Sequence, residues 1–313
     1  MSESRHNPDQ LLKEIQADEE NRNKGHLKIF FGYAAGVGKT YAMLEAAHME
    51  KQQGIDVVAG YVEPHARPKT AALLNGLEVL PTREVFYNGM ILDEFDIGMA
   101  LKRKPQLILV DELAHTNAEG CRHAKRYQDI KELLNAGIDV YTTVNVQHIE
   151  SLCDTVASIT EIVVRERIPD SIFDNADQVE LIDIEPQDLI NRLNTGNVYR
   201  QTQEKQAVEN FFTIENLTAL REISLRRCAD RVNILTENTR IKNHGDYHTG
   251  EHILVCLSSS PSNAKIIRTA AKMASAFKGE FTALFVETPD FSVMSEENVK
   301  RLRSNIRLAE QLG

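Results

Sequence analysis

Two kinds of pattern are missing from this sequence, and each absence excludes a class of protein. The four cysteines, Cys121, Cys153, Cys228 and Cys256, have no paired spacing, which excludes a disulfide framework and a CxxC metal knuckle. No apolar run approaches the ~18 residues that a membrane helix requires, and the polar residues 1–25 contain no signal-peptide core. We therefore expect a protein of the reducing cytoplasm that does not insert into a membrane.

An excess of basic charge is also missing. The chain has a net charge of -10, and its acidic and basic residues are mixed along the whole length. No basic stripe is available to neutralise a phosphate backbone, so nucleic acid is not an expected partner. With 313 residues, of which 42% are hydrophobic, the chain is long enough for two cores, because single cores rarely grow beyond about 250 residues.

The hydrophobic pattern predicts a parallel α/β sheet after a polar tail. The tail, residues 1–25, contains one short helical stretch at residues 11–15. Strands are expected at residues 27–31, 55–63, 107–111, 138–145 and 179–184. The segments between them are long enough for crossover helices, one of which is residues 127–136 with Gly137 as its C-cap. We assign residues 26–235 to this first domain.

A second, smaller α/β domain is expected after a linker at residues 236–251. Residues 201–243 are charged and helical. Beyond the linker we expect strands at residues 252–257 and 281–286, a helix at 263–278 and a last helix at 295–312 with Ser295 as its N-cap. Two strands and two helices do not complete a doubly wound sheet. The second domain, residues 252–313, is therefore expected to be incomplete.

The strongest functional signal is a phosphate-binding pattern at residues 33–40, which we call the phosphate loop. The segment LKIFFGYAAGVGKT places a buried strand and a loop of small residues before a helix at residues 41–51. In a Walker A motif the main-chain N–H groups surround the β-phosphate, the lysine binds β and γ oxygens, and the hydroxyl binds Mg²⁺. The pattern predicts ATP and Mg²⁺ as ligands, with contacts from Ala34, Ala35, Gly36, Val37, Gly38, Lys39 and Thr40.

One position departs from the motif. The leading glycine of GxxxxGK[ST] falls at position 33, where this chain has Tyr33, and Gly32 stands one residue too early. The alternative interpretation is a chance glycine-rich turn between a strand and a helix. The buried strand before the loop and the helix directly after it favour the phosphate site.

The second half of a nucleotide site is predicted at residues 106–112, QLILVDE, a hydrophobic strand that ends in two carboxylates. We expect this strand to lie next to the strand before the loop. Asp111 is then expected to hold the magnesium shell, and Glu112 to orient the attacking water if ATP is hydrolysed. The alternative is an acidic strand end that faces solvent, and the presence of the phosphate loop argues against it.

Further polar side chains follow the predicted strands at the edge where parallel sheets bind ligands. They are Glu63, His65, Arg67, His115, Asn117, Asn145, Gln147 and His148. Each group is a candidate sensor of the γ-phosphate, and ordinary loop polarity is the alternative. His115, Cys121 and His123 lack a fourth ligand at a suitable spacing, so a zinc site is not expected.

Six segments together resemble a known family. They are GYAAGVGKT, YVEPHARPKTAALL, DELAHTN, RHAKRYQDI, GIDVYTTVNVQHIESL and LTALREISLRRCADRV. Over residues 28–232 the chain resembles the N-terminal cytoplasmic domain of the KdpD family, the sensor histidine kinases of bacterial potassium homeostasis. The resemblance implies a P-loop NTPase-like, ATP-binding regulatory domain, followed from His252 onward by a universal-stress-protein-like, Rossmann-like fold.

In some members of this family the second domain is similar to a receptor for cyclic di-AMP, marked by SxS, twenty residues and FTAxY. Here the serines at 258–260 are followed by twenty residues and then FTALF. Serine hydroxyls before a helix can hold phosphate oxygens, and an aromatic ring offers a stacking surface. An ordinary capped turn and a buried strand are the alternative. The resemblance implies contacts to cyclic di-AMP from Ser258, Ser260, Phe281, Thr282, Ala283 and Phe285, the last in place of the usual tyrosine.

The sequence shows no transmembrane bundle, phosphoacceptor-histidine segment or kinase ATP lid, and Asp-Ile-Gly at residues 96–98 is a chance fragment of a DxGxG box. We therefore expect the input portion of such a kinase, at the inner face of the plasma membrane. Its expected partners are the membrane and kinase parts, or a separate kinase or response regulator, and a homodimer is one alternative assembly. Three functions stay open: a regulatory ATP-binding module with little or no turnover, a working ATPase, and a cyclic-dinucleotide binding module.

Overall fold

The computed structural model describes residues 24–63, 68–87, 89–195, 211–243, 252–277, 279–287 and 294–312. The chain divides into two compact units, Met1–Arg231 and Val232–Gly313. The short helix expected at residues 11–15 and the second half of the expected linker, residues 244–251, lie outside the described residues, whereas residues 236–243 of that linker are helical instead.

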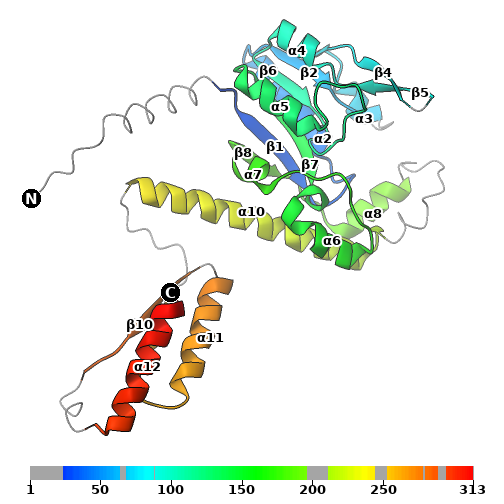
Figure 1. Ribbon diagram of the computed structural model, residues 1–313. Helices are drawn as coiled ribbons and strands as arrows, with labels where there is room; N and C mark the ends of the chain where they lie inside the picture. Colours follow the sequence, from blue (N-terminus) through cyan, green and yellow to red (C-terminus); the bar gives the residue numbers. More distant parts are fainter. Residues whose placement is uncertain are drawn as a thin grey trace, which may run out of the picture. The chain divides into compact units, whose positions relative to one another are not determined.

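The first unit is built around a six-stranded sheet, in the order β3-β2-β6-β7-β1-β8, in which every neighbouring pair of strands is parallel (Figure 1). The strands are β1 Leu27–Gly32, β2 Val57–Tyr61, β3 Glu78–Val79, β6 Leu107–Val110, β7 Asp139–Asn145 and β8 Gln178–Leu181. The predicted parallel α/β sheet is confirmed. β3 escaped prediction because its two residues are both exposed and carry no apolar pattern.

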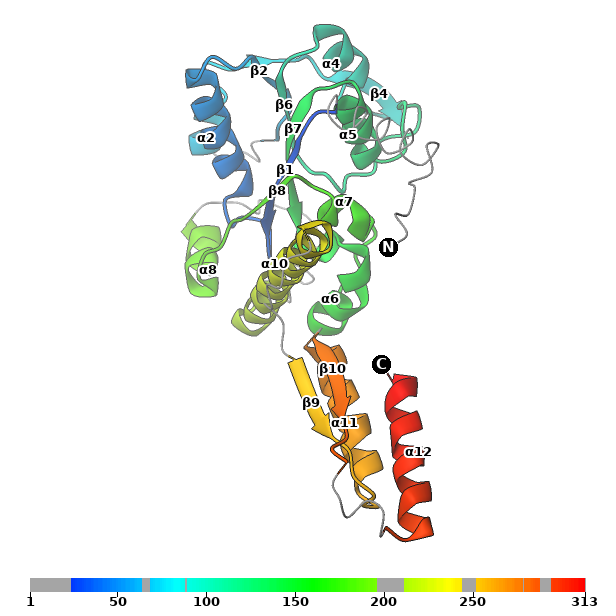
Figure 2. The same ribbon diagram turned by 90° about the vertical axis from the view of Figure 1, so that its left-hand side faces the viewer.

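Helices cover both faces of this sheet, as a parallel sheet requires. Figure 2 shows α2 on one side of the sheet and α5 on the other. In β1, Ile29 and Phe31 pack in the core that holds Ile130 of α5, whereas Phe30 between them packs in the core that holds Met43 of α2. This alternation is the period of two expected of a strand. The helices of the unit are α2 Lys39–Gln52, α3 Pro68–Ala72, α4 Ile97–Arg103, α5 Arg126–Asn135, α6 Cys153–Thr160, α7 Asp170–Asp174, α8 Pro186–Thr195 and α10 Ile214–Asn243, with short 3-10 turns at Val146–His148 and Glu150–Leu152.

Two local features, the end of α5 and the segment before α4, differ from expectation. The C-cap of α5 is Ala136, and Gly137 follows it with a left-handed φ of 79°, the position where glycine commonly ends a helix. The Asp-Ile-Gly fragment begins α4, where the Asp96 carboxylate accepts a hydrogen bond from Met99 N at 3.0 Å. An antiparallel hairpin, β4 Arg83–Tyr87 and β5 Met90–Glu94, precedes this helix and was not predicted.

The long helix α10 is held to the first unit by its N-terminal half. Leu217 and Leu220 are fully buried in the core that also contains Phe31. The Arg227 guanidinium bonds to Asp174 at 2.6 Å, and the guanidinium of Arg231, which is also buried, donates to main-chain oxygens near α7. α10 continues beyond Arg231 to Asn243.

The second unit contains two parallel strands, β9 His252–Cys256 and β10 Glu280–Leu284, and two helices, α11 Asn263–Ala276 and α12 Glu296–Leu312. All four elements were predicted. Its core forms around Val255, Ile267 and Leu302. Across the described parts of both units, no helix is both long and apolar enough to cross a bilayer.

Candidate nucleotide site at the phosphate loop

The loop between β1 and α2 leaves several main-chain donors unused. Gly36 and Gly38 have left-handed φ values of 96° and 114°, which a side chain would strain. Within the described part of the chain, the N–H groups of residues 34–38 donate no hydrogen bond to another described residue. Unused N–H groups that lead into a helix N-terminus form an anion-binding geometry.

The exception at position 33 has a structural explanation. Tyr33 is fully buried in the core, and its hydroxyl donates to the main-chain oxygen of Ile184 at 3.0 Å. Burial, together with the nearby carboxylates of Asp183 and Glu185, raises the pKa of Tyr33 to about 12, so the hydroxyl stays protonated. The Tyr33 side chain therefore points into the core and does not occupy the interior of the phosphate loop. Gly32 permits the close approach, since a Cβ there would lie 2.7 Å from Val37 Cγ2.

Lys39 is buried at the base of the loop, with 8% of its surface exposed. Its ammonium donates to the main-chain oxygen of Ala34 at 3.1 Å and to the side-chain oxygen of Asn145. Asn145 ends β7 directly beside Gly32 of β1, so the sheet register brings it to the loop. The lysine is thus held across the loop by acceptor oxygens that an incoming phosphate could replace.

Thr40 and Asp111 meet although they are far apart in sequence. The Thr40 hydroxyl donates to Asp111 Oδ2 at 3.0 Å, and the Thr143 hydroxyl donates to Asp111 Oδ1. Burial, and to a lesser degree the charge of Glu112, raises the pKa of the Asp111 carboxyl, and the two hydroxyls oppose that shift. A hydroxyl beside a buried carboxylate is the donor set that Mg²⁺ prefers, so these residues fit the ion.

The strand of Asp111 is not adjacent to the strand before the loop, contrary to the prediction. β7 lies between β6 and β1, and its Thr143 bridges the gap. Sequence reasoning missed Thr143, because the order of strands in a sheet is decided by long-range packing. The sequence did contain a signal for this contact, since two polar residues, Thr142 and Thr143, stand inside a predicted buried strand.

Glu112 stands just beyond the strand end in a left-handed conformation with φ of 58°, which is uncommon for a residue other than glycine. Its N–H donates to Asp111 Oδ1 at 3.1 Å and to the Thr143 hydroxyl at 3.3 Å. These bonds hold the strained turn in place. Glu112 helps to line a cavity of about 80 Å³ together with Lys39, Ala114, His115, Thr143, Val144, Asn145, His148 and Glu166.

The two histidines of this cavity have different environments. His148 Nδ1 bonds to the main-chain oxygen of Glu166 at 2.8 Å, and burial lowers the pKa of its ring, which favours the neutral form. His115 Nε2 lies 3.1 Å from the carboxylate of Glu94, which also accepts from the fully buried Arg126 at 3.1 Å. Glu94, Arg126 and Glu166 were not among the predicted site residues, although Arg126 lies within the family segment RHAKRYQDI.

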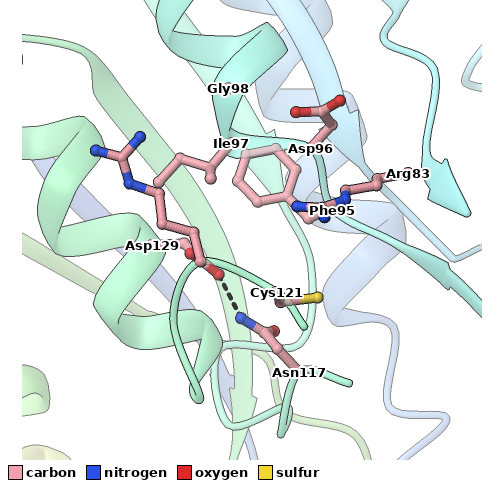
Figure 3. A pocket seen from close by; sticks show the side chains of 9 residues that line it. Arg83, Phe95, Asp96, Ile97, Gly98, Asn117, Cys121 and Asp129 are labelled. Atoms are coloured by element: carbon pink, nitrogen blue, oxygen red, sulfur yellow. Dashed lines mark hydrogen bonds between the residues drawn. The ribbon is translucent and has the colours of Figure 1, made fainter. Parts of the chain in front are cut away.

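The remaining sensor candidates fall elsewhere. Neither Glu63 nor Gln147 is among the residues that line the cavity at Lys39. His65 and Arg67 lie outside the described residues. Asn117 belongs to a separate cavity of about 160 Å³, lined by Arg83, Phe95, Asp96, Ile97, Gly98, Asn117, Cys121, Arg122 and Asp129 (Figure 3).

In this second cavity the Asn117 amide points toward Asp129 and donates to its carboxylate at 2.6 Å (Figure 3). Burial raises the pKa of that carboxyl. Cys121 lines the cavity, whereas His123 bonds to Glu132 at 2.8 Å and His115 to Glu94. The two histidines considered for zinc therefore have separate carboxylate partners, and among the described residues no three His, Cys, Asp or Glu side chains gather to hold a metal.

The serine turn of the second unit, residues 257–262, is closed by its own hydrogen bonds. Asn263 Oδ1 accepts from Ser258 N at 3.1 Å, and the Ser258 hydroxyl accepts from Ser260 N at 3.3 Å. The Ser260 and Ser262 hydroxyls lie 2.9 Å apart. Both Ser258 and Ser260 remain exposed.

The predicted FTALF residues divide between the two faces of β10. Phe281, Ala283 and Phe285 are partly buried against the core of the second unit. Thr282 is exposed on the opposite face, and its hydroxyl lies 2.8 Å from His252 Nε2. Since β9 and β10 are parallel, the structure brings Ser258 and Phe285 to the same sheet edge, whereas Thr282 lies back within the strand.

A parallel sheet with helices on both faces and polar side chains gathered at its carboxyl edge defines the Rossmann-like α/β class that includes the P-loop proteins. Residues 23–232 match the family model of KdpD, described as the osmosensitive K⁺ channel His kinase sensor domain. The chain belongs to this family, which confirms the resemblance inferred from the sequence.

Individual relatives agree with this assignment. The chain is 55% identical to the sensor protein KdpD of Clostridium acetobutylicum over 312 residues and 49% identical to that of Escherichia coli K12 over 314 residues. Both alignments cover 99% of this chain but only 34% of the relative, so the chain spans about a third of their length. A putative sensor protein KdpD of Synechocystis is 47% identical, over 84% of this chain and 70% of its own length.

Proposed function

We propose that the chain is the nucleotide-binding input module of a KdpD-type sensor histidine kinase that controls potassium uptake, and that it binds ATP with Mg²⁺ at the phosphate loop. The contact between the Thr40 hydroxyl and Asp111 Oδ2, 3.0 Å long, carries the proposal. It joins the two residues expected to share the magnesium ion, although they come from separate parts of the chain. The partners in this proposal are the membrane and kinase parts of the sensor, and the module works at the inner face of the plasma membrane.

The bound nucleotide would be held by residues that lie in the loop and at its base. The N–H groups of residues 34–38 and the Lys39 ammonium would hold the phosphate oxygens, and Thr40 with Asp111 would hold Mg²⁺. The ion would neutralise the phosphate charge. The ammonium and N–H donors would replace water around the charged phosphates of the nucleotide. We therefore expect most of the affinity to come from these contacts.

Titration of nucleotide into a Lys39→Ala variant tests the site. Charge-assisted hydrogen bonds contribute about 1.5–3 kcal/mol each, so we expect a loss of about 100-fold in affinity for ATP with Mg²⁺. Lys51→Ala is the matched control. Lys51 lies in the last turn of α2, far from the phosphate loop, and its ammonium donates to the main-chain oxygen of Gly76. Equal affinity of wild type and Lys39→Ala would remove the proposal.

A second candidate function, slow ATP hydrolysis, is favoured by the position of Glu112. Glu112 lines the cavity together with Lys39, where its carboxylate could orient an attacking water. Phosphate release from wild type and Glu112→Gln separates this function from binding alone. A working ATPase requires release by the wild type and a loss of at least about tenfold in the variant, because general-base contributions are typically 10²–10⁴-fold.

Cyclic di-AMP binding by the second unit is a further proposal, supported by the shared edge of Ser258 and Phe285. Exposed serine hydroxyls would hold a phosphate, and the Phe285 ring would stack on a base. Calorimetric titration of the chain with cyclic di-AMP, repeated with Ser258→Ala, tests it. Absence of heat with the wild type would count against this role.

A further inference from the structure

A segment that follows β8 contacts the phosphate loop and the end of the strand before it. We call residues 182–185 the flanking segment. Ile182 N donates to the main-chain oxygen of Phe31 at 2.7 Å. The same residue approaches the glycine that ends β1 and one glycine of the loop: its oxygen lies 3.3 Å from the position of a Cβ on Gly32, and its Cγ2 lies 3.9 Å from that on Gly38. A movement of the loop at Gly38 or of the strand end at Gly32 therefore changes its contacts with Ile182.

Tyr33 makes the specific connection between the loop and the flanking segment. Its hydroxyl donates to Ile184 at 3.0 Å, and its ring is fully buried, so the side chain has little freedom to move alone. A smaller residue at position 33 could not make this bond.

The flanking segment is clamped in turn by α10. The Arg221 guanidinium binds Asp183 through both carboxylate oxygens, at 2.7 to 3.0 Å, and binds Glu185 at 2.6 Å. The two carboxylates stand on either side of Ile184, the residue that accepts from Tyr33. Arg221 of α10 thus binds the residues directly before and after Ile184, to which the loop is bonded through Tyr33.

We infer that Tyr33 is a positioning residue that couples the nucleotide-binding loop to helix α10 through Ile184 and the Arg221 clamp. The loop has to arrange its N–H groups around a phosphate, and Tyr33 is its first residue. A shift of Tyr33 displaces Ile184 between two carboxylates that Arg221 holds, so the displacement reaches α10. Coupling is reciprocal, so the state of α10 changes nucleotide affinity by the same factor. The nucleotide part of this inference rests on the proposed function.

Amide hydrogen exchange of α10 with and without ADP and Mg²⁺ tests the coupling in the full chain. In wild type we expect the nucleotide to slow exchange at residues 217–231 by about fivefold, within the 5–150-fold range typical of coupled sites. Tyr33→Phe, which keeps the ring, and Arg221→Gln should each reduce that slowing to less than twofold and weaken ADP binding by no more than fivefold.

Arg226→Gln is the matched control, since Arg226 belongs to the same helix and its one ion pair among the described residues is with Glu222 on the exposed surface. It should keep the full nucleotide effect. A wild type that binds ADP without any change in α10 would overturn the inference, as would full slowing in Tyr33→Phe.

A second measurement needs no nucleotide. The destabilisation caused by Tyr33→Phe and by Arg221→Gln should be non-additive in a double-mutant cycle measured by urea unfolding, because both changes release the same segment. Additive effects would show that Tyr33 and α10 are not connected. If the wild type fails to bind nucleotide, the proposed function fails, whereas this cycle still decides the connection.

Discussion

The phosphate loop and the serine turn are both connections from a parallel strand to a helix, but they are closed by different means. The phosphate loop relies on two glycines with positive φ, a buried lysine and a carboxylate from another strand. The serine turn has no glycine, and it is closed by Asn263 and by its own hydroxyls. The phosphate loop leaves main-chain donors unused, whereas several polar groups of the serine turn are hydrogen-bonded to one another.

This difference shows what each connection can offer a ligand. In the phosphate loop, buried charges and free N–H groups are held in place before any phosphate arrives, so little reorganisation is needed. In the serine turn, neutral groups are exposed and bonded to one another, and a ligand has to compete with those bonds. We therefore expect substitutions in the phosphate loop to have larger effects than those in the serine turn.

The largest expected effect on stability comes from Gly32→Ala. The new Cβ would lie 2.7 Å from Val37 Cγ2 and 3.3 Å from the oxygen of Ile182, so the loop has to move. We expect the free energy of unfolding to fall by about 3 kcal/mol, measured by urea denaturation. Gly54→Ala is the control: it also replaces a glycine, here with φ of 91°, but its Cβ meets nothing within 4 Å. Its cost should be only the backbone strain, about 1 kcal/mol.

Asp111→Asn should separate ligand binding from stability. We expect a loss of about 30-fold in affinity for ATP with Mg²⁺, about 2 kcal/mol, because the ion loses a charged ligand. Without Mg²⁺ the same change should stabilise the first unit at neutral pH, since burial raises the pKa of Asp111 and so disfavours its ionised form.

The pH dependence of that gain follows from the direction of the shift. A carboxyl whose pKa is higher in the folded state destabilises the fold above that pKa, and the penalty vanishes once the pH falls below the unfolded value of 3.8. Asp111→Asn should therefore raise the midpoint of urea unfolding at pH 7 and leave it unchanged near pH 3. A variant that is less stable than wild type at pH 7 would contradict the pKa assignment.

Much of the architecture follows from local sequence. Each of the predicted strands of the central sheet exists, because an apolar run between turn residues specifies a buried strand whatever its neighbours are. The turn formed by the two glycines of the phosphate loop was also predictable from local sequence, because they stand between a buried strand and a helix. The order of the strands was not predictable, and the wrong neighbour for β6 followed from that.

The site was predicted at the residues whose spacing carries a motif and missed at those brought in by the fold. Thr143 reaches Asp111 only because β7 separates β6 from β1. Tyr33 was read as a weakness of the motif, although its contact with Ile184, 151 residues away, makes it part of the core. Long-range hydrogen bonds of this kind leave no periodic signal in a sequence.

Asn263→Ala gives the smallest of these effects and tests the other half of the comparison. The Asn263 side chain is buried, accepts from Ser258 N and donates to the oxygen of Cys256, both at 3.1 Å. Its removal deletes two part-buried hydrogen bonds to the main chain, so we expect the second unit to lose about 1.5 kcal/mol of unfolding free energy. Ser260→Ala is the control, since its exposed hydroxyl bonds, within the part of the chain that the structure describes, to Ser262 alone, and it should cost less than about 0.5 kcal/mol. If the two changes cost the same, the turn is closed by its serines, and the contrast with the glycine-based phosphate loop would need another physical basis.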